Sequence, residues 1–364
     1  MGGAPGDAVR SVREAVRAGG LLASGEPLIV LLSGGRDSVC LLDVALALQP
    51  PQTVTALHLN YGLRDSADAD ERHCALLCEH LGVALRLVRS DRASAAQSAG
   101  SRETGAGEGT PPAGRHEGGN VQAWAREERY RAACELAREL DPAGGAPVAS
   151  GHTASDQVET ILYRLAASPG RRALLGMAPS DRTRFGQRLI RPLLGITREQ
   201  TTAYCRQREL GWCEDESNLD RAYARARVRV DLVPALRAVH PAAESNVLRT
   251  AALLREEAAV LEELVRAELD GAHSVAIERL QALPAALARL VVVRLAEKAA
   301  GTYVPQAGSR VDELLALAHR GGRAELHLGG GAGAVIEGGR LSVVKLPPRA
   351  AHRAPGHPPL RPPD

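Results

Sequence analysis

Lysine is almost absent from this 364-residue chain, which has only two lysines among its 45 basic residues. Long apolar runs are absent too, since no stretch approaches the roughly 20 residues of a membrane-spanning helix. The N-terminus carries charge but lacks the apolar segment of a secretory signal. These absences predict a cytoplasmic protein without a membrane partner, in which arginine supplies almost all of the positive charge.

Cysteine pairs of the CxxC type are absent, although the chain contains six cysteines. Scattered cysteines without such pairs are typical of free, buried thiols in a reducing compartment. A metal site is the alternative for two of them, which are four residues apart and so share a helix face. The six are Cys40, Cys74, Cys78, Cys134, Cys205 and Cys213, and the two that share a face are Cys74 and Cys78.

The net charge of +2 is small, but the charge is unevenly distributed along the chain. Residues 171–229 contain thirteen arginines against seven acidic residues. A basic segment of this kind suits a phosphate-bearing partner such as a nucleic acid. A solvated surface, in a chain that uses arginine throughout, is the alternative interpretation.

Apolar runs of strand length alternate with segments of helical periodicity in the first half of the chain. This alternation predicts an α/β fold, a doubly wound and mainly parallel sheet with helices on both faces. In such sheets the ligand crevice lies at the carboxyl ends of the strands. Strands are expected at 28–32, 53–59, 83–88 and 147–150, and helices at 8–18, 38–48, 66–81, 121–140 and 155–167.

The alternation stops after about residue 230, which suggests a first domain over residues 1–230, a second domain over 231–347 and a Pro-rich, disordered tail over 348–364. Residues 91–119 are small, polar and rich in Gly, Ser and Pro, which predicts a disordered insertion. Residues 168–192 are basic and rich in loop-forming residues. The second domain is expected to be smaller and helical and to end in a β-hairpin, with helices at 242–268, 277–300 and 309–319.

The sequence LIVLLSGGRDS places a glycine-bearing turn between a buried strand and a helix. Gly34 and Gly35 permit close backbone approach, and the helix start favours an anion there. Ser33 and Ser38 add hydroxyl donors, but the turn has neither the lysine of a Walker loop nor the pattern GxGxxG. Asp37 would repel a phosphate unless Mg²⁺ lies between them. The turn therefore predicts a phosphate cradle with a metal, and a plain turn with Asp37 or Ser38 as the helix N-cap is the alternative.

The motif SGGxDS in this setting resembles the phosphate loop of the N-type ATP pyrophosphatases, the PP-loop superfamily. Four further stretches resemble the tRNA(Ile)-lysidine synthetase family within it. They are HLNYGLR (58–64), NVQAWAREERY (120–130), GHTASDQVET (151–160) and LGWCEDESNLDRAYARARVRVDLVPAL (210–236). The resemblance implies an enzyme that uses ATP and Mg²⁺ to join free L-lysine to C2 of cytidine 34 in the CAU anticodon of isoleucine tRNA. An adenylated cytidine would form on the way, with release of AMP and pyrophosphate. The resemblance also implies that residues 1–230 form the PP-loop catalytic domain and that the helical domain over 231–347 binds the tRNA.

The same resemblance implies which residues form the site. Asp156 and Glu159 are three apart on one helix face, where they could hold a lysine ammonium, Mg²⁺ or both. A capping box, with Asp156 as the N-cap and Glu159 at N3, is the alternative. Arg126 would offer a rigid fork to phosphate or carboxylate. Catalytic roles are thus expected for Asp37, Arg126, Asp156 and Glu159, nucleotide binding for Ser33, Gly34, Gly35, Arg36, Asp37, Ser38, His58 and His152, metal binding for Asp37, and a tRNA path along Tyr223, Arg225, Arg227 and Arg229.

Two positions depart from the family pattern. Tyr61 stands where the family usually has His, and a tyrosine cannot carry a proton near neutral pH. Ala226 stands where an asparagine usually precedes an arginine, which removes a side-chain contact but leaves the fold unaffected.

Other functions stay open at this stage. A tRNA thiolase of the same superfamily would carry paired cysteines, which this chain lacks. An ammonia-using synthetase would need an ammonia source, and a tRNA-binding paralogue without catalysis is kept open by Tyr61. No obligate protein partner is evident, and the sequence leaves a homodimer open.

Overall fold

The computed structural model describes residues 8–22, 25–62, 67–90, 117–167, 171–214, 221 and 224–347. The chain divides into two compact units; of the described residues, those up to Ala251 form the first unit and those from Ala252 onward form the second. The division falls inside helix α11 (Ala243–Leu269), whereas the sequence suggested a boundary after residue 230. The expected tail 348–364 and residues 91–116 of the expected insertion lie outside the described residues. The last three residues of that insertion belong to helix α5 (Glu117–Leu140).

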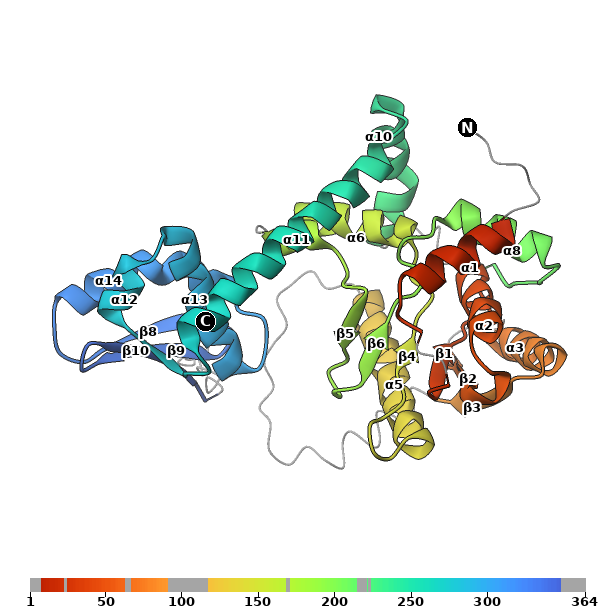
Figure 1. Ribbon diagram of the computed structural model, residues 1–364, viewed down its shortest axis with the longest axis horizontal. Coiled ribbons are helices and arrows are strands. Elements are labelled where there is room, and N and C mark those ends of the chain that lie inside the picture. Colours follow the sequence, from red (N-terminus) through yellow and green to blue (C-terminus); the bar gives the residue numbers. More distant parts are fainter. Residues whose placement is uncertain are drawn as a thin grey trace, which may run out of the picture. The chain divides into compact units, whose positions relative to one another are not determined.

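The first unit is built around a six-stranded sheet with the order β3-β2-β1-β4-β6-β5 (Figure 1). Neighbouring strands are parallel except for β5, which runs antiparallel to β6 at one edge. The doubly wound, mainly parallel sheet predicted from the alternation is therefore confirmed. The strands are β1 (Leu28–Leu31), β2 (Val54–Asn60), β3 (Ala84–Arg89), β4 (Val148–Ala149), β5 (Ser180–Arg182) and β6 (Arg188–Ile190).

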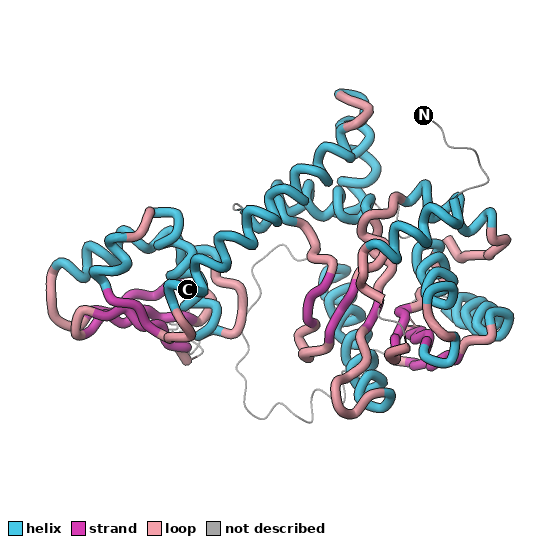
Figure 2. Tube along the Cα trace, in the orientation of Figure 1, coloured by secondary structure: helices cyan, strands magenta, loops and turns pink. Residues whose placement is uncertain are grey.

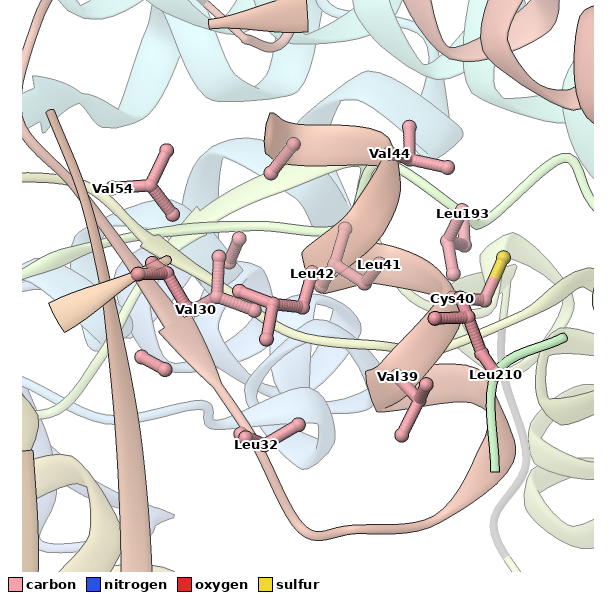
Figure 3. Packing of buried hydrophobic residues seen from close by; sticks show 14 of the residues in the cluster. Val30, Leu32, Val39, Cys40, Leu41, Leu42, Val44, Val54, Leu193 and Leu210 are labelled. Atoms are coloured by element: carbon pink, nitrogen blue, oxygen red, sulfur yellow. The ribbon is translucent and has the colours of Figure 1, made fainter. Parts of the chain in front are cut away.

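Helices cover both faces of this sheet because successive residues of a strand point to opposite sides. From β1, Leu28 and Val30 pack into one hydrophobic cluster with α2 (Figure 3), whereas Ile29 and Leu31 pack into another with α5. A strand buried on both faces has a continuous apolar sequence, which is why LIVL was recognisable as a strand. The first cluster also includes residues of three further helices; these are α1 (Ala8–Ala18), α3 (Ala67–Leu81) and α8 (Arg198–Gln207), beside α2 (Arg36–Leu48).

The stretch 168–192, expected to be rich in loops, contains β5 and β6. Each strand has three residues, too few for an alternating pattern to stand out. Leu189 of β6 nevertheless pairs with Val148 of β4, and its side chain is buried in the cluster under α5. This hairpin therefore extends the sheet on the side of β4.

The second unit packs helices against a sheet of antiparallel strands (Figure 2). The four strands of this sheet have the order β7-β10-β9-β8. The expected hairpin is too small a description, because Gly338 and Gly339, with φ of +56° and +72°, split the last β-like stretch into two strands. The expected helix over 277–300 is broken at Pro284, which cannot continue the preceding helix. The elements are β7 (Ser274–Ala276), α12 (Ile277–Ala282), α13 (Ala285–Ala300), η5 (Pro305–Arg310), α14 (Val311–His319), β8 (Ala324–Gly329), β9 (Ala332–Glu337) and β10 (Arg340–Lys345).

The centre of the first sheet is a topological switch point. From β1 the chain continues to β2 on one side, and β4 leads to β6 on the other, so the two loops that follow β1 and β4 flank a crevice. The loops are in contact, since a Cβ atom on Gly151 would lie 3.0 Å from the backbone of Asp37. The fold thus places SGGRDS beside GHTASDQVET, which opens helix α6 (Ala154–Ala167). Among the described helices, none has the length and apolarity needed to cross a membrane.

Candidate functional site

The loop Ser33–Ser38 is closed by its own hydrogen bonds. The Ser38 hydroxyl donates to the Gly35 carbonyl at 2.7 Å and accepts from the Ser33 backbone N–H at 3.2 Å. Gly35 is the N-cap of α2, and no side chain caps it. The interpretation of Asp37 or Ser38 as the N-cap is therefore wrong. An uncapped helix start with a hydroxyl on either side of the turn is suited to hold an anion.

Gly34 is required by the backbone of this loop. Its φ is +82°, a conformation that residues with a side chain rarely adopt. A Cβ atom there would also lie 3.3 Å from the Sγ atom of Cys74 and 3.7 Å from that of Cys213. Gly35 differs, because its φ is −74° and its nearest such contact is 3.5 Å, to the Ser33 hydroxyl. The fold thus requires a glycine at position 34, whereas a Cβ atom could be accommodated at position 35.

Asp37 lies in the first turn of α2 with its carboxylate held by two neighbours. The Thr201 hydroxyl donates to Oδ1 at 2.5 Å, and Arg36 donates from Nε to Oδ1 at 3.2 Å and from Nη2 to Oδ2 at 3.3 Å. Thr201 is fully buried in α8, a helix that the sequence did not mark as part of the site. Arg36 therefore turns toward Asp37 and Thr201 in this structure.

Asp156 and Glu159 come together on the first turns of α6, as their spacing predicted. Asp156 belongs to a capping box, because its Oδ2 accepts from the backbone N–H of Thr153 at 2.8 Å while the Thr153 hydroxyl accepts from the backbone N–H of Asp156 at 3.4 Å. The alternative with Asp156 as the N-cap and Glu159 at N3 is therefore wrong, because Thr153 is the N-cap and Asp156 is the N3 residue. Glu159 is buried, with 4% of its surface exposed, and takes no part in that cap.

Two arginines neutralise this pair of carboxylates. Arg198 donates to Asp156 Oδ1 and Glu159 Oε1, each at 3.2 Å. Arg229 donates from Nε to Glu159 Oε1 at 2.7 Å and from Nη2 to Glu159 Oε2 at 3.0 Å. Arg229 lies in the π-helical turn η4 (Val228–Leu232), between α9 (Ala224–Arg227) and α10 (Val233–Val239). Such turns recur at functional sites.

Each charged group of this cluster stabilises the charged form of its partner. Burial alone would raise the pKa of Asp156, but Arg198 and the hydrogen bonds from Thr153 outweigh it and the pKa is lowered. Burial would lower the pKa of Arg229, but its hydrogen bond to Glu159 outweighs that effect and the pKa is raised. Asp156 and Arg229 therefore carry full charges at neutral pH.

His152 lies next to this cluster in a positive environment. Burial, followed by the charges of Arg191, Arg126 and Arg225, lowers its pKa to about 4, although Asp156 acts in the opposite direction. Its Nδ1 is 2.7 Å from the Ser150 hydroxyl. His152 is therefore neutral at pH 7, and the positive charge around it comes from Arg191, Arg126 and Arg225.

Arg191 is a basic residue of this pocket that the sequence did not single out. It is 5% exposed, its Nη1 donates to the Ala178 carbonyl at 2.6 Å, and its Nε has no hydrogen-bond partner within the described structure. Arg126 lies on the exposed face of α5, with its guanidinium 5.1 Å from the centre of the Tyr130 ring. A buried arginine with an unpaired Nε, as in Arg191, favours an anionic ligand.

His58 and Tyr61 support the loops from β2. His58 is buried and its Nδ1 is 2.9 Å from the Leu32 carbonyl, just before the phosphate loop. The Tyr61 hydroxyl donates to the Ala125 carbonyl at 2.9 Å and accepts from Arg129 at 3.2 Å, and its ring meets Trp124 edge-on at 5.7 Å. Tyr61 thus connects the end of β2 to α5. Ala226 is buried in α9.

The site offers few protein ligands for a metal ion among the described residues. No group of three or more His, Cys, Asp or Glu residues with metal-ligand geometry occurs in the part of the chain that the structure describes. None of the six cysteines, all of which lie in the described residues, forms a disulfide. Burial raises the pKa of Cys74 to about 12 and of Cys78 to about 11, so these two thiols stay protonated at neutral pH. A magnesium ion in this site would thus take one oxygen from Asp37 and the rest from substrate phosphates and water, as Mg²⁺ commonly does.

The chain matches a known domain family and several curated proteins. A family profile described as a PP-loop domain matches residues 8–236, more than half of the chain. Curated relatives named tRNA(Ile)-lysidine synthase include one from Chromobacterium violaceum, 36% identical over 245 residues, and one from Dehalococcoides mccartyi, 34% identical over 269 residues. These alignments cover 66% and 71% of this chain but 50% and 52% of the relatives, so the chain spans about half of their length.

One relative of similar length and one solved structure complete the comparison. The tRNA(Ile)-lysidine synthase of Salinispora tropica is 33% identical over 346 residues, which cover 92% of this chain and 96% of that relative. The U34-tRNA thiolase NcsA from Methanococcus maripaludis, solved with its 4Fe-4S cluster, matches 68% of this chain and 79% of its own with a TM-score of 0.50 at 17% identity. That second likeness shows the fold alone. On the PP-loop match and the near full-length alignment, the chain belongs to the tRNA(Ile)-lysidine synthase family.

Proposed function

We propose that this protein ligates free L-lysine to C2 of cytidine 34 in the CAU anticodon of an isoleucine tRNA, with cleavage of ATP to AMP and pyrophosphate. Relatives named tRNA(Ile)-lysidine synthase support the substrate. The observation that carries the proposal is the contact of the phosphate loop with the segment that opens α6, which brings Asp37 close to Asp156 and Glu159. A nucleotide site and an acidic, amine-binding site thus share one crevice.

In the first step, ATP binds with its phosphates on Ser33–Ser38. The backbone N–H groups at the start of α2 have no side-chain cap, and the Ser33 and Ser38 hydroxyl oxygens lie 3.2 Å apart in this loop, which supports an anion site here. Mg²⁺ would be held by Asp37 and would neutralise charge on the phosphates. Asp37 must release its contact with Arg36 to do so, which leaves Arg36 available for a phosphate oxygen.

The cytidine O2 atom then attacks the α-phosphorus and pyrophosphate leaves. This step depends on positioning and on charge neutralisation. Arg126 and Arg191 lie on the side of the crevice where His152 sits, so they could stabilise the negative charge that develops. Neutral His152 adds no charge of its own but offers a hydrogen bond. The product is an O2-adenylated cytidine, in which AMP is a good leaving group.

In the second step, the lysine amine attacks C2 and displaces AMP. Asp156 and Glu159 would bind an ammonium group of the substrate, sharing their oxygens with Arg198 and Arg229. The attacking amine must be neutral, and a cluster that already contains two arginines favours release of its proton. The two arginines thus balance the charge of the carboxylates. At this cluster they favour the neutral form of the amine that attacks C2 over its charged form.

The tRNA would be bound mainly through its phosphates. Residues 171–229, with thirteen arginines against seven acidic residues, would supply positive charge for this contact. The target base must leave its stack in the single-stranded anticodon loop. Action on tRNA also implies a cytoplasmic location.

The test is an incubation of the protein with ATP, Mg²⁺, radiolabelled lysine and a CAU-anticodon isoleucine tRNA transcript. Label in the RNA, with AMP and pyrophosphate in equal amounts, is expected. Incorporation of sulfur instead of lysine would indicate a thiolase, and tRNA binding without either product would indicate a paralogue without catalysis. The variant Asp37→Asn should lose pyrophosphate release while keeping its affinity for tRNA, and a variant that still turns over would refute the role of Asp37.

A further inference from the structure

The first turn of α8 touches both acidic parts of the site. Arg198 opens the helix and donates to Asp156 and Glu159, each at 3.2 Å. Thr201, three residues later and hence on the same face, donates to Asp37 Oδ1 at 2.5 Å. The turn is well fixed, because Thr197 and Gln200 form a reciprocal capping box around it.

The Thr201 hydroxyl has two acceptors for one proton. Its Oγ1 lies 2.5 Å from Asp37 Oδ1 and 3.0 Å from the Arg198 carbonyl, the acceptor one turn back in its own helix. Thr201 is fully buried, so a lost hydrogen bond would be costly. If Asp37 moves toward a ligand, the hydroxyl can turn to the Arg198 carbonyl and stay bonded. Thr201 can therefore hold Asp37 and release it without leaving a buried donor unsatisfied.

The two oxygens of Asp37 are held unequally. Oδ1 accepts from Thr201 at 2.5 Å and from Arg36 Nε at 3.2 Å, whereas Oδ2 accepts from Arg36 Nη2 at 3.3 Å. The weakly held Oδ2 is the oxygen that a ligand can take over most easily. Thr201 holds the other oxygen, Oδ1, and so fixes the plane of the Asp37 carboxylate.

We propose that Thr201 is a positioning residue, which holds Asp37 in the orientation that the nucleotide step needs. The proposal rests on the role of Asp37 in the proposed function. Neither the phosphate-loop motif nor the spacing of the carboxylates indicates Thr201, because it lies 164 residues from Asp37 in the chain. Its action would be on the ATP step, because its hydroxyl contacts Asp37 and neither Asp156 nor Glu159 in the described structure.

Thr202 offers a matched control. It is the next residue of α8, also a threonine, and its hydroxyl donates to the same Arg198 carbonyl at 2.8 Å. Thr201→Val and Thr202→Val therefore remove the same group from the same helical turn, with the same change in shape. Only the first removes a contact to Asp37, together with the hydrogen bond that Arg36 Nε donates to the Thr201 hydroxyl at 3.2 Å.

The experiment measures pyrophosphate release in the full-length protein with tRNA, lysine and varied Mg²⁺-ATP. Thr201→Val should lower kcat/KM for Mg²⁺-ATP about tenfold, the effect of one hydrogen bond to a charged group, while Thr202→Val stays within about twofold of the wild type. The KM for lysine should be unchanged in both, and Thr201→Ser, which keeps the hydroxyl, should recover most of the lost activity. A general loss of structure would alter lysine use and would not be rescued by serine.

Equal kcat/KM values for Thr201→Val and Thr202→Val would overturn the proposal. If Thr201→Val does not fold, Thr201→Ala replaces it with the same expectation. Asp37→Asn is measured alongside to separate the two hypotheses. An inactive Asp37→Asn with an unaffected Thr201→Val refutes only the positioning role, whereas an active Asp37→Asn refutes the role of Asp37 itself.

Discussion

Each of the three carboxylates at the site is neutralised within the chain. Asp37 contacts Arg36, and Asp156 and Glu159 contact Arg198, with Arg229 bound to Glu159 as well. Buried charges need such partners, since removing one partner leaves the other without compensation. The ion pairs are therefore part of the fold as well as of the site.

Replacing Arg229 by alanine tests the structural part of this balance. Glu159 is buried and would keep only the longer contact to Arg198. We expect the free energy of unfolding to fall by about 2–3 kcal/mol in Arg229→Ala, measured by urea denaturation. Arg227→Ala, on the exposed side of the same helical segment, serves as the control and should change it by less than about 1 kcal/mol. Similar losses in both variants would contradict the pairing.

His152 makes stability depend on pH. Its pKa is about 4 in the folded protein and roughly 6.5 when unfolded, so the unfolded chain binds the proton more tightly. The stability contributed by neutral His152 is complete above the unfolded pKa and is lost as the pH falls toward 4. We expect the free energy of unfolding of the wild type to decrease more between pH 6.5 and pH 4 than that of His152→Gln. Parallel curves for the two proteins would show that His152 is not held neutral.

At this scale the sequence identified the acids but not their partners. Asp37, Asp156 and Glu159 lie in short motifs that follow strands, and such motifs are local. Their partners Thr201, Arg198 and Arg229 lie between 39 and 164 residues away, so only the packing of α8 and η4 selects them. Thirteen arginines between 171 and 229 gave no reason to prefer two of them.

The helices and strands that build the site differ in how well they can be predicted from the sequence. The strand–turn–helix units β1–α2 and β4–α6 were predicted within a few residues, the first from the short apolar sequence LIVLL. The hairpin of β5 and β6 was missed because three-residue strands carry no pattern. Helix α8 could have been found from Thr197 and Gln200, whose spacing is that of a capping box.

The turn between β1 and α2 makes different demands on its two glycines. Gly34→Ala forces a side chain into a positive-φ conformation, 3.3 Å from the Cys74 sulfur, and should lower the free energy of unfolding by about 1–3 kcal/mol. Gly35→Ala meets only an ordinary contact at φ −74° and should change it by less than about 1 kcal/mol. Chemical denaturation of both variants is the measurement. A larger loss for Gly35→Ala than for Gly34→Ala would contradict the account of the loop.

At the scale of the whole molecule, composition predicted an α/β catalytic part followed by a helical part with antiparallel strands. It could not predict that the division into compact units falls within α11, because a continuous helical pattern has no mark where its contacts change. The four-stranded sheet of the second unit was also underestimated, since the three residues of β7 lie far from the hairpin in sequence.

The arginine-rich composition predicts how tRNA binding responds to salt. Contacts of arginines with phosphates release counterions, so the logarithm of the affinity should fall linearly with the logarithm of the salt concentration. We expect affinity for the tRNA to drop about tenfold or more between roughly 50 and 200 mM KCl, in a filter-binding titration. Affinity that is independent of salt would argue against binding through phosphates.

The most direct test of the central claim is to trap the intermediate. The protein is mixed with the CAU-anticodon tRNA and with ATP labelled at the α-phosphorus, first without lysine and then with it. The arrangement of Ser33–Ser38 beside Asp156 and Glu159 predicts label on the tRNA before lysine is added, and its release as AMP afterwards. A tRNA that never acquires the label, although lysine is incorporated, would contradict it.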